Sequence, residues 1–446
     1  MDTRNRISSA VLALFVLLTF GGRGRTHNAQ TIKSQVSSPR VEALQKQLQK
    51  GDSAAVARFW EEVRKAGTPL VESIPGDRRN VLVTFLWRGA EATRNVVVFS
   101  QTGGLNPADN QMARLPGSDV WHRSYVFRKD VRFLYKLSPN DDLTPLDAPG
   151  LDWQKRFAHV QTDPLNPRLY PPGAGATDWT TQSVAELPGA PPQPWARRKT
   201  GVPAGKVEEH KIKSGILNNE RNVWVYLPAG YREQDKAHPL LILFDGQSYL
   251  DQVPTPLILD NLIAAGKIPP TIAVLVDNPG PAERERELPC HRPFADFLSQ
   301  ELLPWVRERY RVTADPGRTV LAGSSYGGLA ATCAAMWYPG SFGNFLSQSA
   351  SYWWKPEGEA EYEWVRRQFS AGPKLPLRAF LTVGLLETIP KPGNTNQVEV
   401  NRRLRDALKA KGYEVKYAEF DGAHEYINWQ GTLADGLIAL LGGGRR

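Results

Sequence analysis

The pattern of apolar and polar positions along the chain predicts two differently built halves. Between residues 40 and 66 apolar side chains recur at helical spacing and form one face. After Pro75-Gly76 the pattern changes to short runs of β-branched and aromatic residues, separated by Gly, Pro and Asn, at residues 81–87, 95–100, 120–126 and 131–137. We therefore expect residues 40–137 to form a small β-sandwich domain with a leading helix.

The second half alternates between continuous apolar runs and helical patterns. The apolar runs are typical of strands covered on both faces of a sheet and lie at residues 223–227, 240–244, 272–276, 319–322 and 379–383. Helical patterns lie near residues 257–266, 294–310, 327–337, 396–411 and 429–441. This alternation predicts an α/β domain over residues 205–446. The stretch 138–204 is rich in Pro, Asp and Gly, and we expect it to connect the two domains along the surface.

The most informative motif is Gly323-Ser-Ser-Tyr-Gly327. It follows an apolar run and opens a helix of small residues. A serine between a strand and a helix in this spacing is typical of a nucleophile held at the end of the sheet of an α/β-hydrolase. The flanking glycines permit the tight turn and close packing of strand and helix. The sequence therefore predicts that Ser325 is a nucleophile.

A nucleophilic serine needs a base, and the base needs an orienting acid. In this fold the chain order is serine, acid, histidine, and His424 is the histidine that fits, because it follows the predicted strand 414–420 in a glycine-containing loop. Glu387 comes three residues after the apolar strand that precedes it and is the predicted acid. Asp421 and Glu425 are alternatives, although they lie very close to the histidine in sequence.

An acyl-transfer site also needs backbone donors for the oxyanion. The amide of Tyr326, which follows the predicted nucleophile, is one candidate. The second is expected in the loop after residues 240–244, at Gly246 or Gln247. Glycine permits the backbone geometry that such a loop requires.

Charge and cysteine content narrow the possible partners. The formal charge is +9, yet no block of Lys and Arg marks a nucleic-acid arm, so we expect no nucleic acid. A basic surface around a pocket would suit an anionic small-molecule ligand, and scattered surface charge is the alternative. No Cys/His spacing resembles a zinc site, and no metal ligands are predicted. The two cysteines are Cys290 and Cys333. A buried free thiol is expected at Cys333, and a disulfide between the two stays open for an exported protein.

The first thirty residues have the features of an export signal. Arg4 and Arg6 precede an apolar run at residues 11–20, which is too short to span a bilayer. We expect export to the periplasm. Secretion, or anchoring in the inner membrane by an uncleaved leader, is the alternative, and a membrane contact is expected only through that anchor.

Beyond residue 55 the chain resembles the enterochelin (enterobactin) esterases. In the first half the similar segments are residues 83–88, 117–121, 163–167 and 187–195. In the second half they include residues 244–247, 287–290, 322–329, 346–354 and 421–424. The resemblance covers both predicted domains and both the nucleophile and the histidine motifs.

The resemblance implies an esterase-D-like α/β-hydrolase that acts on a cyclic trilactone of serine carrying three catechol amides. The substrate would be bound as its ferric complex, and hydrolysis would assist iron release. No cofactor is implied, since iron enters only within the siderophore. The complex is trianionic and aromatic, which suits substrate-binding roles for Arg284, Arg286, Trp353 and Trp354. A solvated loop for the arginines and core packing for the tryptophans are the alternatives.

Two features depart from the family. Its members often carry Arg-Glu-Pro around the acid, whereas this chain has Leu386-Glu387-Thr388. Two-domain members are mostly cytoplasmic, whereas this chain carries a leader. An exported feruloyl or acetyl carbohydrate esterase, with the β-domain binding substrate, is therefore an alternative. A non-catalytic ligand-binding protein on the same fold is a second.

Overall fold

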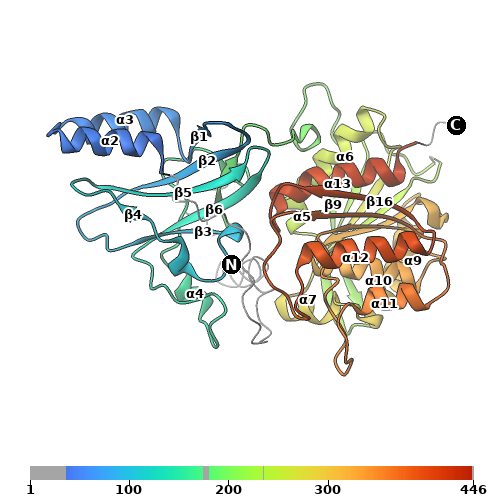
Figure 1. The fold of residues 1–446 in the computed structure, drawn as a ribbon. Coiled ribbons are helices and arrows are strands. Elements are labelled where there is room, and N and C mark those ends of the chain that lie inside the picture. Colours follow the sequence, from blue (N-terminus) through green and yellow to red (C-terminus); the bar gives the residue numbers. More distant parts are fainter. Residues whose placement is uncertain (1–36, 174–179, 235, 444–446) are drawn as a thin grey trace. The chain divides into compact units, whose positions relative to one another are not determined.

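The computed structural model describes residues 37–173, 180–234 and 236–443, and the predicted export signal lies outside them. The chain divides into two compact units (Figure 1). The N-terminal unit holds the described residues up to Pro191 together with Asp421–Glu425, and the C-terminal unit holds Pro192–Phe420 and the chain from Tyr426 onward. Within the described ranges we find no helix with both the length and the apolar character needed to cross a membrane.

Two helices open the N-terminal unit, α2 (Pro39–Gln49) and α3 (Ala55–Ala66). The hydroxyl of Ser38 accepts a hydrogen bond from the amide of Val41 and caps α2, and proline at the first helical position needs no amide partner. The leading helical pattern is thus confirmed, but it is broken at Gly51, which has a φ of 80°.

The N-terminal unit contains two four-stranded antiparallel sheets. Their strands are β1 (Leu70–Ile74), β2 (Asp77–Arg88), β5 (Val120–Arg128) and β4 (Ala113–Arg114) in one sheet, and β3 (Val96–Ser100), β6 (Arg132–Pro139), β8 (Gln182–Glu186) and β7 (Leu169–Tyr170) in the other. The buried ring of Phe85 on β2 lies 4.6 Å from that of Tyr135 on β6 and 6.3 Å from that of Phe133. The two sheets therefore pack face to face, which confirms the predicted β-sandwich.

The stretch predicted to be a surface connection is largely part of this sandwich. Residues 138–191 belong to the N-terminal unit, and β8 lies next to β6 in its sheet. A short helix, α4 (Trp153–Arg156), is fixed by a buried ion pair between Arg156 and Asp141. The prediction was wrong here because Pro, Asp and Gly mark the turns between short elements as strongly as they mark a linker.

The C-terminal unit is built around an eight-stranded sheet. In spatial order its strands are β16 (Glu414–Phe420), β15 (Arg378–Gly384), β14 (Asn344–Gln348), β13 (Thr319–Ser324), β11 (Leu240–Phe244), β12 (Ile272–Val276), β10 (Asn219–Leu227) and β9 (Lys206–Ser214). The ladders from β12 to β16 are parallel, and β10 is antiparallel to both its neighbours. The predicted α/β-hydrolase domain is confirmed.

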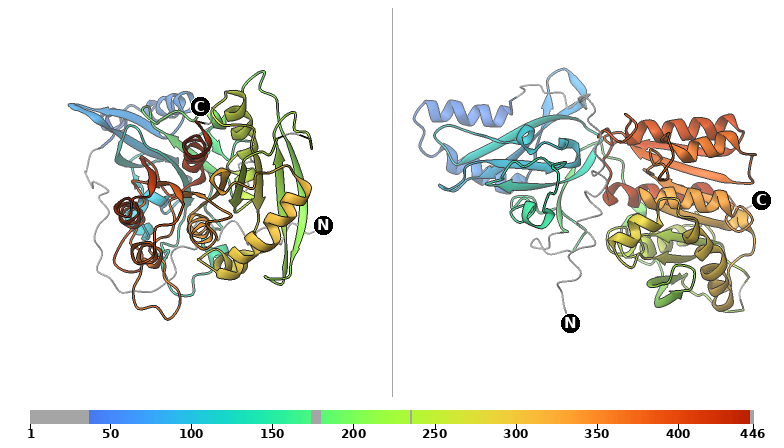
Figure 2. Two further views of the ribbon diagram at one scale, coloured as in Figure 1. Left: turned by 90° about the vertical axis from the view of Figure 1, so that its right-hand side faces the viewer. Right: turned by 90° about the horizontal axis from the view of Figure 1, so that it is seen from below.

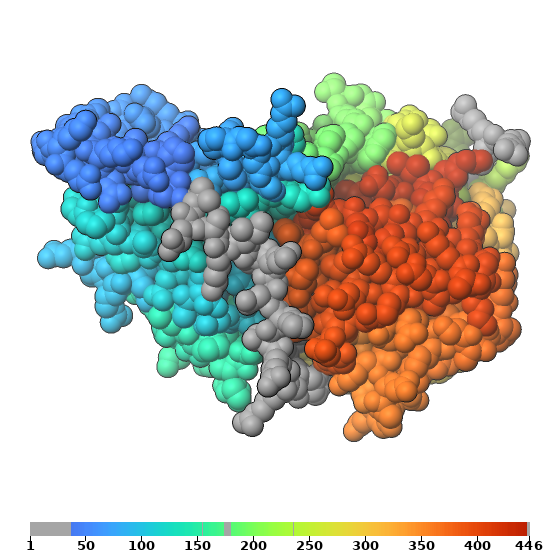
Figure 3. All heavy atoms as spheres, in the orientation of Figure 1, coloured from blue at the N-terminus to red at the C-terminus, as the bar shows by residue number. Residues whose placement is uncertain are grey.

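Helices cover both faces of this sheet (Figures 1 and 2). They are α5 (Ser248–Asp251), α6 (Thr255–Ala264), α7 (Pro281–Glu287), α8 (Arg292–Phe297), α9 (Leu303–Arg309), α10 (Tyr326–Trp337), α11 (Trp364–Ala371), α12 (Gln397–Ala410) and α13 (Tyr426–Leu441). Helices α6 and α13 contact each other on one face, and α10, α11 and α12 lie on the other. In Figure 3, α12, β16 and α13 form one outer face of this unit, coloured orange to red.

A disulfide joins Cys290, in the turn between α7 and α8, to Cys333 on α10. The two Cα atoms lie 5.4 Å apart. The expectation of a free thiol at Cys333 was wrong. The disulfide with Cys290, which was the alternative for an exported protein, is the one observed. Sequence spacing did not reveal the pair, because the turn at Cys290, with a φ of 47°, carries its side chain back onto α10.

Candidate active site

Ser325 lies in the turn between β13 and α10. Its backbone has a φ of 56° and a ψ of −120°, a combination that a residue with a side chain adopts only under strain. The Ser325 amide donates to the carbonyl oxygen of Gln348 at 2.9 Å, and its own carbonyl accepts from the amide of Leu329. A Cβ atom at position 323 would lie 2.5 Å from the carbonyl carbon of Gly327, so the turn requires glycine there.

Glu387 is buried, with 6% of its surface exposed, and lies just beyond the end of β15. Its Oε1 accepts hydrogen bonds from the hydroxyl of Ser349 at 2.6 Å and from the amide of Gly384 at 2.7 Å. Ser349 also accepts a bond from the indole nitrogen of Trp429 at 3.2 Å. Glu387 is therefore held in one orientation at the carboxyl edge of the sheet rather than exposed in a loop.

The sheet register brings the strand ends that carry these residues side by side. Gly384 on β15 pairs with Phe420 on β16, and the amide of Leu385 donates to the carbonyl oxygen of Phe420. The segment with His424 begins directly after Phe420. By its packing, however, this segment belongs to the N-terminal unit, whereas Ser325 and Glu387 belong to the C-terminal unit.

Two candidates for the second oxyanion donor differ in their bonding. The amide of Gly246 donates to the carbonyl oxygen of Val276 at 3.0 Å, so it is committed to the backbone. The amide of Gln247 makes only a long contact, 3.4 Å, with a carboxylate oxygen of Asp277. Burial raises the pKa of Asp277 to about 6.

The first candidate donor is the amide of Tyr326. It lies at the start of α10, in the first helical turn, where amides have no acceptor within the helix.

Arg284 on α7 forms a two-pronged ion pair with Asp245, at 2.7 and 2.9 Å. Asp245 has a φ of 57° and opens the loop with Gly246, and it also accepts a bond from Asn278. The structure therefore commits Arg284 to holding this loop. Helix α7 is itself fixed by Glu287, which forms a fully buried ion pair with Arg221 on β10.

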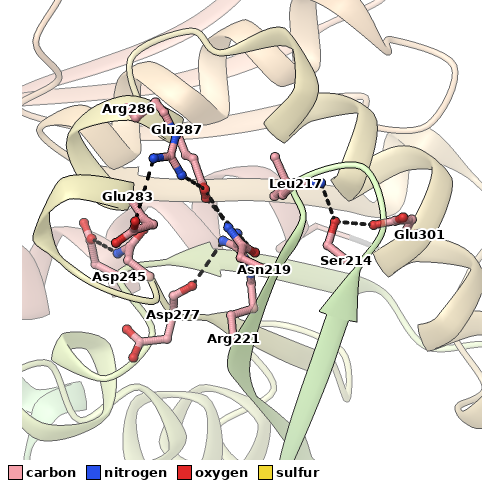
Figure 4. Close-up of polar contacts among 11 residues, drawn as sticks. Ser214, Leu217, Asn219, Arg221, Asp245, Asp277, Glu283, Arg286, Glu287 and Glu301 are labelled. Atoms are coloured by element: carbon pink, nitrogen blue, oxygen red, sulfur yellow. Dashed lines mark hydrogen bonds and ion pairs between the residues drawn. The ribbon is translucent and has the colours of Figure 1, made fainter.

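The other residues predicted to bind substrate have different surroundings. Arg286 is half exposed and pairs with Glu283 and Glu287 (Figure 4). Trp353 is buried, and its ring centroid lies 6.0 Å from that of Tyr326. Trp354 is partly buried and meets a neighbouring tryptophan edge to face. Of the four, Arg284 and Trp353 adjoin Tyr326, the residue after Ser325, since the guanidinium of Arg284 also lies 5.9 Å from the ring of Tyr326.

Three residues near these strand ends had no role in the sequence reading. Ser349 donates to Glu387, and the hydroxyl of Ser351 lies 3.4 Å from that of Ser325. Both lie within the run 346–354, which stood out only through the family resemblance. Lys391 lies in the loop after Glu387, and burial lowers its pKa to about 8 while the nearby carboxylate opposes that shift.

The sheet order, with a serine in a strained turn after a central strand, defines an α/β-hydrolase of the esterase class. The Esterase family model matches residues 214–440, and the model described as "Enterochelin esterase, N-terminal" matches residues 82–196. The chain belongs to the enterobactin esterase family, as the resemblance led us to expect.

Individual relatives match both halves of the chain. An iron(III) enterobactin esterase from Dickeya dadantii is 32% identical and covers 86% of this chain and 93% of its own length. An iron(III) salmochelin esterase from Escherichia coli is 30% identical and covers 90% and 98%. The ferric enterobactin esterase structure from Salmonella typhimurium has a TM-score of 0.70 at 30% identity, covering 85% and 98%. The Shigella flexneri enzyme, solved in the presence of enterobactin, has a TM-score of 0.69 at 30% identity, covering 86% and 97%.

Proposed function

We propose that this protein is a serine esterase that hydrolyses the trilactone ester bonds of a ferric catecholate siderophore such as enterobactin and so assists iron release. The observation that carries the proposal is the match to iron(III) enterobactin esterases over most of the chain, in both units. A related structure was determined in the presence of enterobactin itself. The substrate is thus a small aromatic ester, and iron takes part only as its bound metal.

In the proposed mechanism Ser325 Oγ attacks an ester carbonyl of the trilactone while His424 accepts the hydroxyl proton. His424 then returns the proton to the leaving serine alkoxide, which leaves a linear product attached as an acyl-enzyme. Water attacks the acyl-enzyme by the same route and regenerates the serine. Glu387, with its carboxylate fixed by two hydrogen bonds, orients the histidine and stabilises its charged form.

The oxyanion of each tetrahedral intermediate would be stabilised by the amides of Tyr326 and Gln247. The position of Tyr326 at the start of α10 supports this role, because the helix dipole favours negative charge there. Gln247 is preferred to Gly246, whose amide already donates to Val276. The ion pair between Arg284 and Asp245 would hold the loop that carries Gln247. No cofactor is needed for this chemistry.

We also propose that the protein works in the periplasm. Two observations support this. The apolar run at residues 11–20 follows two arginines, as in an export signal. The disulfide between Cys290 and Cys333 is of a kind that persists in oxidising compartments. Fractionation of cells that produce the full chain should place the protein in the osmotic-shock fraction, and recovery in the cytoplasm would contradict the proposal.

The test of function is incubation of the purified protein with ferric enterobactin, with the products followed by mass spectrometry. Linear trimer, dimer and monomer should appear in turn, each hydrolysis adding one water. Ser325→Ala should produce none, whereas Ser324→Ala, which changes the neighbouring buried serine, should retain activity. An intact trilactone alongside cleavage of a feruloyl or acetyl ester would instead favour a carbohydrate esterase. Cleavage of neither ester would favour a binding protein.

A further inference from the structure

The segment Asp421–Glu425 carries the proposed base and has an unusual place in the fold. The chain leaves β16 at Phe420 and enters α13 at Tyr426, and both of these elements belong to the C-terminal unit. The five residues between them nevertheless pack with the N-terminal unit. The contacts that hold this segment within the N-terminal unit therefore determine where the histidine backbone lies.

Strand β6 offers the segment an open edge. Strand β3 pairs with β6 from Tyr135 to Pro139 and ends at Ser100, opposite Tyr135. Beyond that point the amide of Arg132 donates to the carbonyl oxygen of Asp421 at 3.2 Å, and a parallel bridge links Arg132 with Gly422. The histidine segment thus continues the sheet where β3 stops, as an added strand does at a sheet edge.

Two side chains add to this attachment. The carboxylate of Glu425, which is 2% exposed, accepts a bond from the amide of Leu134 at 3.0 Å, two residues along β6 from Arg132. The side-chain amide of Gln101, just after β3, donates to the carbonyl oxygen of His424 at 2.9 Å. The bond from Gln101 therefore holds the backbone of His424, and the bond from Leu134 holds the next residue, Glu425.

We propose that Gln101 and Glu425 are positioning residues for the base, and that the open edge of β6 is the support on which His424 is held. The inference rests on the proposed function, since it concerns the same histidine. Glu425 was an alternative for the acid from sequence, but its carboxylate is committed to β6, which favours a positioning role. The bonds of the N-terminal unit would then set the place of the histidine backbone.

The test uses the full-length protein and two readouts that need an activated serine but no siderophore. One is the rate of inactivation by a fluorophosphonate probe, and the other is kcat and KM for p-nitrophenyl acetate. Glu425→Ala should lower the inactivation rate and kcat by about tenfold or more, with KM changed less than about twofold, because displaced catalytic groups lose rate rather than binding. Glu425→Gln keeps an acceptor oxygen and should recover most of the loss. Gln101→Ala should cause a loss of about threefold.

Asp119→Ala is the matched control. In the same unit, Asp119 accepts bonds from the indole of Trp60 at 2.7 Å and from Arg88 at 2.8 Å, so its removal costs stability without touching the histidine segment. Its inactivation rate should equal that of the native protein. The thermal midpoint of every variant is measured alongside, so that loss of fold is separated from loss of position.

The outcomes separate the two proposals. If His424→Ala and Ser325→Ala block the reaction while Glu425→Ala and Gln101→Ala react at the native rate, the positioning role is overturned and the proposed function stands. A loss in Glu425→Ala that Glu425→Gln does not recover, or that Asp119→Ala matches, also overturns it. If His424→Ala reacts like the native protein, the proposed mechanism itself fails.

Discussion

Ser325, the proposed nucleophile, and His424, the proposed base, are held in different ways. Ser325 and Glu387 follow the parallel strands β13 and β15, which flank β14 in the sheet. The Ser325 backbone and the Glu387 carboxylate are fixed by bonds within the C-terminal unit, to Gln348, Ser349 and Gly384. His424 lies in five residues whose backbone and flanking carboxylate are bonded to the N-terminal unit. The positions of Ser325 and Glu387 are set by strand register, whereas the segment with His424 is held by its bonds within the N-terminal unit.

This difference bears on how activity depends on folding. Strand register is fixed by the apolar core of the sheet, and changing it would move every side chain of a strand to the opposite face. The attachment of the histidine segment includes an ion pair between Arg128 and Asp421 and several hydrogen bonds, each hydrogen bond contributing about 1 kcal/mol. We therefore expect the histidine side of the site to be the more sensitive to mutation in the N-terminal unit.

The largest effect should come from the proposed base and nucleophile. It tests whether Ser325 and His424 take part in the same proton transfer. Ser325→Ala and His424→Ala should each lower kcat/KM for p-nitrophenyl acetate by about 10⁴-fold or more, because removing either group disables the same proton transfer. The double variant should be no worse than either single one. Additive losses would mean that the two residues act independently and would refute the triad.

The next effect concerns the disulfide, which joins α10, the helix after Ser325, to the turn between α7 and α8. Cys290 and Cys333 are the chain's two cysteines, and both belong to the C-terminal unit. Replacing both by serine should lower the free energy of unfolding of that unit by about 3 kcal/mol, since the bond closes a long loop. Urea unfolding should show the loss in the C-terminal transition alone. A dithiothreitol-treated native protein should match the variant, and an unchanged transition would mean that the bond contributes no stability.

Much of the C-terminal unit could be predicted because its strands are continuous apolar runs and its nucleophile turn follows a local rule. Strand β14 was missed for a physical reason. Asn344, Ser347 and Gln348 make it polar in sequence, yet all three are buried and hydrogen-bonded, to Thr319, Tyr352 and Trp429 in turn. Buried polar residues that are bonded in this way hide a strand from an apolar pattern.

The support of the histidine could not be predicted at all. Gln101 and His424 are 323 positions apart, and the bond between Leu134 and Glu425 spans 291. Neither contact can be detected from the local spacing of apolar and polar residues. Each contact depends on the part of the β6 edge that β3 does not cover. The long stretch after residue 137 was misread for a similar reason, since its five-residue strand β8 is defined by its partner β6 rather than by its composition.

A pH effect of intermediate size should be confined to the C-terminal unit. Burial raises the pKa of Asp277 to about 6, above its ordinary value of 3.8. The folded state therefore favours the protonated form of Asp277. The contribution of this carboxyl to the free energy of unfolding is complete below about pH 4, and it is lost as the pH rises through 6. Asp277→Asn mimics the neutral form and should be more stable than the native protein at pH 8 by about 2 kcal/mol, but not at pH 4. Urea unfolding at both pH values measures this, and an equal difference at both would contradict the assignment.

The smallest effect compares two buried serines of the C-terminal unit that each donate to a glutamate. One glutamate, Glu387, belongs to the proposed site, and the other does not. Ser349→Ala removes the hydroxyl that holds Glu387 and should lower kcat by about tenfold, because the carboxylate loses one of its two fixed donors. Ser214→Ala is a close match, since Ser214 is also buried and donates to a glutamate, Glu301, but on β9 at the other end of the sheet (Figure 4). Both should lose similar stability in thermal unfolding, whereas only Ser349→Ala should lose rate. Equal rates would show that Glu387 keeps its orientation without the Ser349 hydroxyl, and would contradict the proposed role of Ser349.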